Sequence, residues 1–264
     1  MNFSTINLKI IDSAAYVTIN RPEVRNALNG TVVEELLTVI TELNHNNDIR
    51  CIILSGEGKS FCSGADLKWL GEVAGFTYQQ NYEESHRLVE LLYLIHDHSK
   101  PVIARVNGSA VGGGVGLMLV SDIIIADEDA VFGLSEVAIG IVPAAIVPFV
   151  LARIGETKAR ELLITGERVS AGEAMKMGLI NYAVNRDKLD EEVNIKLKYI
   201  LNNGPNAVKT VKEMINVLRS AGREESVGYI SNVIAKLRTG DEGREGMKSF
   251  LEKRTPSWRI NNQE

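Results

Sequence analysis

A glycine-rich turn at residues 112–116 is the stretch of this sequence best suited to chemistry. It follows a strand-like apolar run at 102–106, and the apolar residues 117–120 that come next predict a buried helix. The first N–H groups of such a helix have no partner inside it, so they can donate hydrogen bonds to developing negative charge. The pattern indicates an oxyanion site. Close packing of the helix against the strand would also require glycines, and the turn alone does not decide between the two.

Two nucleotide-binding patterns are excluded by their spacing. A dinucleotide-binding turn needs a small residue three positions after Gly116, where this chain has Leu119. A P-loop ending at Gly58 needs a glycine five residues earlier, where this chain has Ile53.

Glu136 is the candidate for proton transfer. It follows a short strand-like segment at 132–134 and precedes the apolar run 137–142. Apolar surroundings favour the neutral form of a carboxyl group, which makes it useful as an acid or base near neutral pH. A glutamate at the end of a strand can also simply face water, because glutamates are rarely buried without a partner. The sequence leaves both possibilities open.

Other catalytic and metal chemistries find little support. None of the four histidines (His45, His86, His96 and His98) has metal-ligand partners in sequence, and we predict that all four are ordinary surface residues. We predict no metal site. A G-x-S-x-G motif is absent, so a serine hydrolase is not indicated. Two cysteines, Cys51 and Cys62, suit a reducing compartment better than a disulfide framework.

Composition indicates an ordinary globular protein. Of the 264 residues, 45% are hydrophobic and 24% are charged, and the net charge is −5. The negative charge and the lack of a dense Lys/Arg block argue against nucleic acid as a partner. No apolar run approaches the length of a membrane span, and the first residues resemble neither a signal nor a transit segment. We therefore expect a cytoplasmic protein with no membrane association.

Strand and helix patterns alternate over the first 140 residues, which is typical of an α/β fold. The predicted strands are the hairpin 6–10 and 15–19, then 51–54, 102–106, 122–126, 131–134 and 180–184. Helices are predicted from an N-cap at Asn29 to residue 43, from an N-cap at Asp66 to 70, and over 88–95. Residues 71–80 are predicted as a surface loop or a mobile segment over a pocket. From 144 onward the chain is mainly helical, with a capping box at 170–173 and helix breaks at 203–205, 220–222 and 239–240.

Five motifs in register along the chain carry a family resemblance. They are 63–68 (SGADLK), 107–108 together with 112–114 (NG and GGG), 121–123 (SDI), 132–136 (FGLSE) and 249–254 (SFLEKR). Their order and spacing resemble the enoyl-CoA hydratase/isomerase family, the crotonases. The resemblance implies a spiral of repeated β-β-α units over residues 1–190, which holds an acyl-CoA site. It also implies a helical region over 191–264 that joins subunits into homotrimers or homohexamers.

The resemblance also implies roles for individual residues. The backbone N–H groups of Ala65 and Gly113 would hold the thioester oxygen of an acyl-CoA, and Glu136 would carry the proton. Contacts with coenzyme A, which is part of the substrate rather than a cofactor, would come from the stretches 24–27 and 62–65 and from Lys253. The substrate-binding set that follows is Val24, Ala27, Cys62, Gly64, Ala65, Asp66, Lys68, Gly112, Gly113, Gly116 and Lys253.

One departure from the family pattern bears on the reaction. Typical hydratases of the family carry a second glutamate where this chain has Gly116. A hydratase in which Glu136 alone handles water and proton is the first hypothesis, and the run 132–145 is similar to hydratases of branched or glutaconyl-type acyl-CoAs, as in leucine degradation. The alternatives are an enoyl-CoA isomerase, which needs only one carboxylate, and a non-catalytic acyl-CoA-binding relative.

Overall fold

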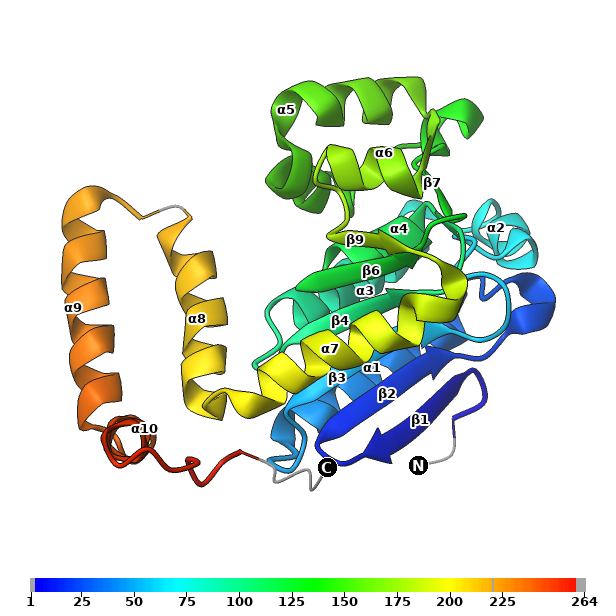
Figure 1. Cartoon of the computed structure of the whole chain (residues 1–264). Coiled ribbons are helices and arrows are strands. Elements are labelled where there is room, and N and C mark those ends of the chain that lie inside the picture. The colour runs from blue at the N-terminus through cyan, green and yellow to red at the C-terminus, as the bar shows by residue number, and fades with distance from the viewer. Residues whose placement is uncertain (1–2, 220, 260–264) are drawn as a thin grey trace.

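The computed structural model describes residues 3–219 and 221–259. A six-stranded sheet in the order β1-β2-β3-β4-β6-β9 forms the centre of the fold (Figure 1). The antiparallel hairpin is β1 (Ile6–Ile11) and β2 (Ala14–Ile19), and the parallel strands that follow are β3 (Cys51–Gly56), β4 (Val102–Val106), β6 (Ile123–Asp127) and β9 (Tyr182–Val184). All six residues of β3 are buried. Its unbroken apolar run is what a parallel strand covered on both faces requires.

Helices cover both faces of this sheet. On one face lie α1 (Gly30–His45) and α3 (Tyr78–His96), and on the other lies α7 (Leu189–Asn202) (Figure 1). The side chain of Asn29 caps α1 by accepting a hydrogen bond from the backbone N–H of Val32, as the sequence predicts. Leu189, Val193 and Leu197 of α7 pack into a second, smaller core on their side of the sheet. The sheet is therefore a rigid platform for the loops at its edges.

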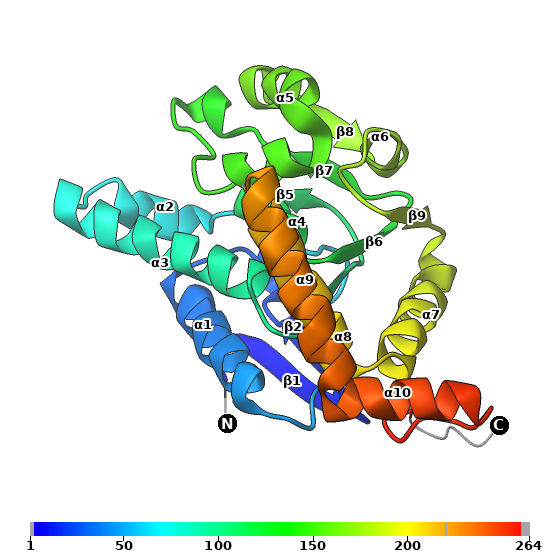
Figure 2. The ribbon, with the colours of Figure 1, turned by 90° about the vertical axis from the view of Figure 1, so that its left-hand side faces the viewer.

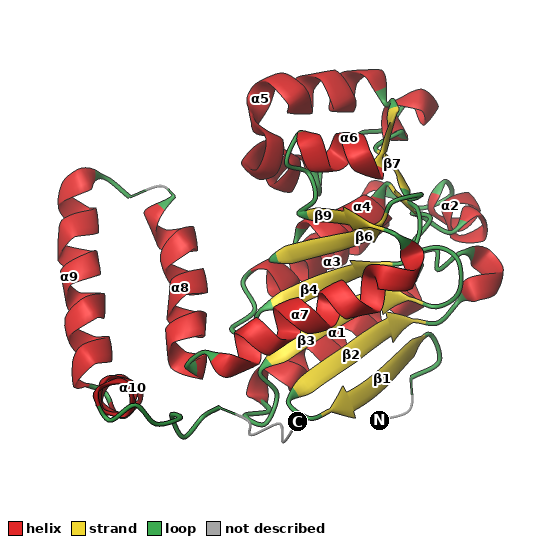
Figure 3. Cartoon of the chain, viewed as in Figure 1, coloured by secondary structure: helices red, strands yellow, loops and turns green. Residues whose placement is uncertain are grey.

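A smaller sheet, ordered β5-β7-β8, stands beside the large one and carries the glycine-rich turn. It consists of β5 (Ala110–Val111), β7 (Val131–Gly133) and β8 (Arg168–Ser170). Near it lie α2 (Leu67–Val73), α4 (Gly113–Leu119), α5 (Val147–Thr165) and α6 (Ala171–Lys176) (Figure 3). The chain also forms the 3-10 helices η1 (Pro22–Val24), η2 (Glu136–Ile139) and η3 (Arg186–Lys188). The capping box predicted at Ser170 and Glu173 begins α6.

The last three helices form an arm that stands away from the sheet (Figures 1 and 2). This C-terminal arm comprises α8 (Pro205–Leu218), α9 (Arg223–Thr239) and α10 (Asp241–Leu251). Side chains of α8 hold the arm to the rest of the chain. Lys212 pairs with Asp122 at 2.7 Å, and Asn216 donates a hydrogen bond to the carboxylate of Asp97 at 3.0 Å.

Most predicted elements are confirmed, and two expectations are wrong. Residues 71–80 contain no long loop, because α2 extends to Val73 and a capping box at Thr77 starts α3 at Tyr78. His98 is not at the surface: it is 2% exposed, and burial lowers its pKa to about 4. The short strands β5 and β8 were not predicted. No helix among the described residues is both long enough and apolar enough to span a bilayer.

Candidate active site

Two chain segments far apart in sequence lie side by side at the glycine-rich turn. The backbone N–H of Val111 donates to the carbonyl oxygen of Cys62 at 3.0 Å, which joins the end of β5 to the 62–65 segment. A β-carbon on Gly64 would lie 2.8 Å from the carbonyl oxygen of Val111, and Gly64 has a φ of +89°. Both the close approach and the backbone conformation therefore require glycine at position 64.

The backbone N–H groups of Ala65 and Gly113 are free to bind a ligand. Leu28 bonds the residues on either side of Ala65, donating to the oxygen of Gly64 at 2.7 Å and accepting from the N–H of Asp66 at 2.8 Å. Gly113 is the first residue of α4, so its N–H has no partner within the helix. In the part of the chain that the structure describes, neither N–H donates a hydrogen bond. The two N–H groups lie on neighbouring backbone segments, because a β-carbon on Gly64 would stand 3.8 Å from Cα of Gly112.

Glu136 brings a carboxyl group to the same turn. It begins η2, and its Oε1 lies 2.9 Å from the point where a β-carbon on Gly112 would stand. The residue is half-buried, and Oε2 is buried without a hydrogen-bond partner among the described residues. Burial raises the pKa of the carboxyl above its ordinary value. Of the two possibilities that the sequence leaves open, the structure favours the apolar environment suited to proton transfer.

Gly116, where the family's second glutamate would stand, faces apolar side chains. A β-carbon there would lie 3.0 Å from Cγ1 of Ile146 and 3.5 Å from Cδ1 of Leu92. Gly116 itself is buried. The space beside it is filled by hydrocarbon, so Glu136 has no carboxylate partner at this position.

The stretches expected to contact coenzyme A lie alongside one another. The N–H of Ser63 donates to the carbonyl oxygen of Arg25 at 3.0 Å, which holds the 24–28 loop against the 62–65 segment. Val24 is exposed at the end of η1, whereas Ala27 is buried. Cys62 is also buried, and burial raises the pKa of its thiol to about 12. Only the backbone of Cys62 is thus available for a ligand.

The three charged residues of the predicted substrate-binding set differ in their surroundings. The carboxylate of Asp66 caps α2 and pairs with Arg21 at 2.8 Å, and this hydrogen bond lowers its pKa. Lys68 is exposed in the first turn of α2. Lys253 follows α10 on the C-terminal arm, away from α2 and α4 in both views of the chain (Figures 1 and 2). Within one chain, the structure does not bring Lys253 to the turn.

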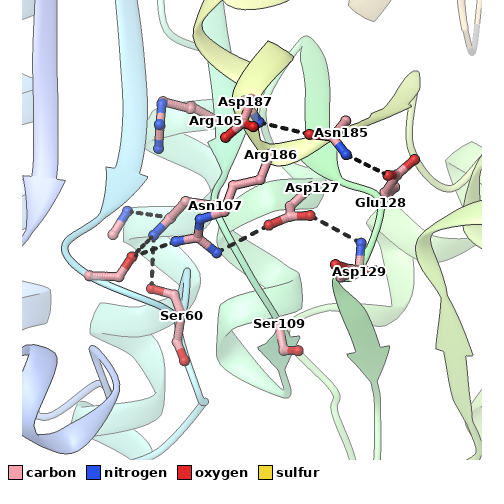
Figure 4. A network of polar contacts seen from close by, with 12 residues as sticks. Ser60, Arg105, Asn107, Ser109, Asp127, Glu128, Asp129, Asn185, Arg186 and Asp187 are labelled. Carbon is pink, nitrogen blue, oxygen red and sulfur yellow. Dashed lines mark hydrogen bonds and ion pairs between the residues drawn. The ribbon is translucent and has the colours of Figure 1, made fainter.

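A polar network holds the loop that leads into the 62–65 segment (Figure 4). The guanidinium of Arg186 donates to Asp127 and to the carbonyl oxygen of Gly58, both at 3.2 Å. Asn107 donates to the same carbonyl at 2.9 Å, and Asn26 donates to the carbonyl of Ser60 at 2.7 Å. Sequence reasoning did not identify this network, since its members come from five separate segments without a motif. These hydrogen bonds fix the backbone at Gly58 and Ser60, a few residues before the candidate donor Ala65.

A cavity of about 480 Å³ lies elsewhere, beside α7, and is lined by residues that include Tyr16, Arg105 and Arg186. Arg105 is bound there by Asp190, with hydrogen bonds of 2.5 and 3.1 Å. None of the predicted site residues lines this cavity. The residues with the required chemistry lie at the glycine-rich turn, outside this cavity.

Comparisons with known proteins match nearly the whole chain in sequence and in fold. The sequence model of the family described as "Enoyl-CoA hydratase/isomerase" matches residues 9–261. A relative from Thermus thermophilus, which carries a provisional enoyl-CoA hydratase name, is 35% identical over 242 residues, covering 92% of this chain and 96% of the relative. The crystal structure of an enoyl-CoA hydratase from Shewanella pealeana has a TM-score of 0.94 at 32% identity, covering 97% of this chain and 96% of that one. An enoyl-CoA hydratase/isomerase from Marinobacter aquaeolei has a TM-score of 0.93 at 32% identity, covering 97% and 99%.

Proposed function

Because the chain belongs to the enoyl-CoA hydratase/isomerase family, we propose that it adds water to the double bond of a 2-enoyl-CoA with Glu136 as its single acid/base. The family acts on acyl-CoA thioesters. The observation that carries the proposal is the position of the Glu136 carboxyl beside Gly112, next to the free N–H groups of Gly113 and Ala65. The Glu136 carboxyl can move a proton, and the two N–H groups can hold an oxyanion.

In this mechanism the two N–H groups bind the thioester oxygen. Glu136 in its ionised form accepts a proton from a water molecule while the water oxygen bonds to Cβ. The π electrons shift to Cα and onto the thioester oxygen, giving an enolate that both N–H groups stabilise. Each preorganised donor is worth about 3 kcal/mol. Glu136 then gives its proton to Cα, and the carboxylate is regenerated.

The raised pKa of Glu136 suits both halves of this cycle. A carboxyl that holds its proton more tightly than an ordinary glutamate is a stronger base toward water, and efficient proton transfer requires a pKa near the working pH. Within this proposal the acyl group is branched or glutaconyl-type, as the similarity of the 132–145 run to such hydratases implies.

A second candidate, migration of a double bond from C3–C4 to C2–C3, is favoured by one observation. Ile146 and Leu92 fill the space beside Gly116, so position 116 offers no second carboxylate to position water. An isomerase needs only one group to take a proton from C2 of a 3-enoyl-CoA and deliver it to C4 through the same oxyanion-bound intermediate. The non-catalytic alternative is the weakest, because the candidate carboxyl and both free donors are present together.

Parallel assays on one set of thioesters separate these functions. Crotonyl-CoA, 3-methylcrotonyl-CoA and 3-methylglutaconyl-CoA report water addition through loss of the enoyl absorbance, while 3-enoyl-CoAs report migration through its gain. We expect hydration to have the higher kcat/KM, and Glu136→Gln to abolish it. Migration faster than hydration on matched chain lengths would favour the isomerase. If neither reaction occurs although acyl-CoA binds, the protein is not an enzyme of this kind.

A further inference from the structure

We propose that Ile146 is a specificity-determining residue of this site, forming the wall against which the substituent at Cβ of the acyl group rests. The inference rests on the proposed function, since it needs an acyl thioester bound at the donors of Ala65 and Gly113. It concerns which acyl groups fit and not how they react. Four features of the structure support it.

The first feature is the register of α4. Gly116 lies one turn beyond Gly112, and its N–H donates to the carbonyl oxygen of Gly112 at 3.2 Å. Side chains on a helix lean toward its N-terminus, so a side chain at position 116 would cover the turn that contains Gly112 and Gly113. Whatever fills the space beside Gly116 therefore borders the oxyanion turn.

The second feature is what fills that space. The place of a β-carbon on Gly116 is 3.0 Å from Cγ1 and 3.4 Å from Cδ1 of Ile146, and 3.5 Å from Cδ1 of Leu92. Ile146 is 2% exposed and Leu92 is fully buried. This border of the turn is closely packed and entirely apolar, so adding or removing a methyl group there changes the available room.

The third feature is the link between this wall and the catalytic carboxyl. Ile146 ends the segment that begins with Glu136, and its N–H donates to the carbonyl oxygen of Pro143 at 2.9 Å. Earlier in the same segment, the N–H of Ile141 donates to the carbonyl oxygen of Glu136 at 3.2 Å. These short-range hydrogen bonds fold residues 136–146 into one connection, which carries both the Glu136 carboxyl and the Ile146 side chain.

The fourth feature is the chemistry of the acyl group. With its thioester oxygen at the two donors and its Cα facing Glu136, Cβ is one bond further along the chain. Glu136 lies beside Gly112 and Ile146 lies beside Gly116, one helical turn further along α4. In the proposed binding mode, the groups attached to Cβ extend from the carboxyl toward Ile146. One methylene in an apolar pocket changes selectivity by about 10- to 200-fold. The volume at position 146 therefore sets how large a Cβ substituent the site accepts.

The test compares the binding of three saturated, unreactive thioesters by calorimetry: butyryl-CoA, 3-methylbutyryl-CoA and 3,3-dimethylbutyryl-CoA. In Ile146→Ala, the affinity for the branched ligands relative to butyryl-CoA should rise about tenfold or more over wild type, and in Ile146→Val a smaller rise should follow. Gly116→Ala should change the ratio in the opposite direction, because its new methyl pushes Ile146 toward the ligand. The matched control, Ile103→Val, removes a methylene from the second core beside α7 and should leave the ratio unchanged.

Failure of this inference is distinguishable from failure of the proposed function. If wild type binds none of the three thioesters, the proposed function and the inference both fall. If wild type binds them and the ratio in Ile146→Val and Gly116→Ala stays within about twofold of wild type, Ile146 is core packing only and the inference alone is overturned. These two mild variants decide the outcome even if Ile146→Ala does not fold, because each changes the side chain by a single carbon atom.

Discussion

The Oε1 atom of Glu136 lies 2.9 Å from the point where Gly112 would carry a β-carbon. With a φ of +51°, Gly112 also has a backbone conformation that other residues rarely adopt. Any side chain at position 112 would displace the carboxyl and strain the turn. The glycine thus leaves room for the proton carrier immediately beside the N–H of Gly113.

Replacing Glu136 by glutamine tests its role as the proton carrier. Glu136→Gln keeps the size of the side chain but cannot exchange a proton, so we expect kcat to fall by about two to four orders of magnitude. Binding of a saturated acyl-CoA should persist, since the proposed contacts are backbone N–H groups. Glu128→Gln, an exposed carboxyl beside Asn185, serves as the control and should retain full activity. A folded Glu136→Gln enzyme with most of the wild-type rate would exclude Glu136.

The same residue makes stability depend on pH. Burial raises the pKa of Glu136 in the folded state, so between its ordinary pKa and the raised one the folded state binds more protons than the unfolded state. The favourable contribution of the neutral carboxyl is present at low pH and is lost as pH rises through the raised pKa. We expect Glu136→Gln to match wild type in urea unfolding near pH 4 and to be more stable near pH 7. Equal differences at both pH values would show that burial does not perturb this carboxyl.

A pair of substitutions at Gly113 separates loss of the N–H donor from added bulk. Both Gly113→Pro and Gly113→Ala place a β-carbon 2.9 Å from Cδ1 of Leu28, but only proline removes the N–H. Proline is accepted at the first position of a helix, which Gly113 occupies. We expect Gly113→Pro to lower kcat about a hundredfold or more relative to Gly113→Ala. Circular dichroism checks folding, and similar kcat values in the two variants would rule out this donor.

Exposed apolar side chains on the C-terminal arm indicate that the chain self-associates. Its helices expose apolar side chains, among them Ile215, Val227 and Ile234, that one chain leaves uncovered. We expect light scattering to give the mass of a trimer or of two trimers. Ile215→Glu should lower that mass, whereas Ile10→Glu on the exposed face of β1 should not. A monomer at micromolar concentration would leave the arm without its expected partner.

The sequence was sufficient for elements whose pattern is local. The alternation in β1 and β2, the unbroken apolar run of β3 and the N-caps at Asn29 and Asp66 each act over a few residues, and all are confirmed. It failed where distant partners decide the structure. β5 has only two residues and exists because Ala110 pairs with Phe132 and Val111 with Gly133. No local pattern can indicate such a strand.

In the candidate site, too, local features could be predicted from the sequence, whereas features set by tertiary packing could not. The glycine-rich turn was evident from residue types, because the backbone conformation of Gly112 and the close approach at Gly64 admit little else. The burial of Glu136 could not be predicted, since it depends on how η2 folds against that turn. His98 was misplaced for a related reason. It is buried, and residues distant in sequence, among them Ile40 of α1 and Lys212 of α8, act on its imidazole.

The two proposed donors are 48 positions apart in the chain (113 − 65) and stand in segments too short to be stable alone. Ala65 directly precedes Asp66, the N-cap of α2, and Gly113 begins α4. Each of these helices has seven residues, well below the length at which an isolated helix persists in water. The chain between the donors must close before they can meet, and loop closure costs entropy that local helices do not incur. In stopped-flow refolding, far-UV circular dichroism should therefore recover before binding of a fluorescent acyl-CoA. Identical rates for the two signals would mean that the site forms together with the helices. If binding recovers later, the protein passes through a helical intermediate that does not yet recognise its ligand.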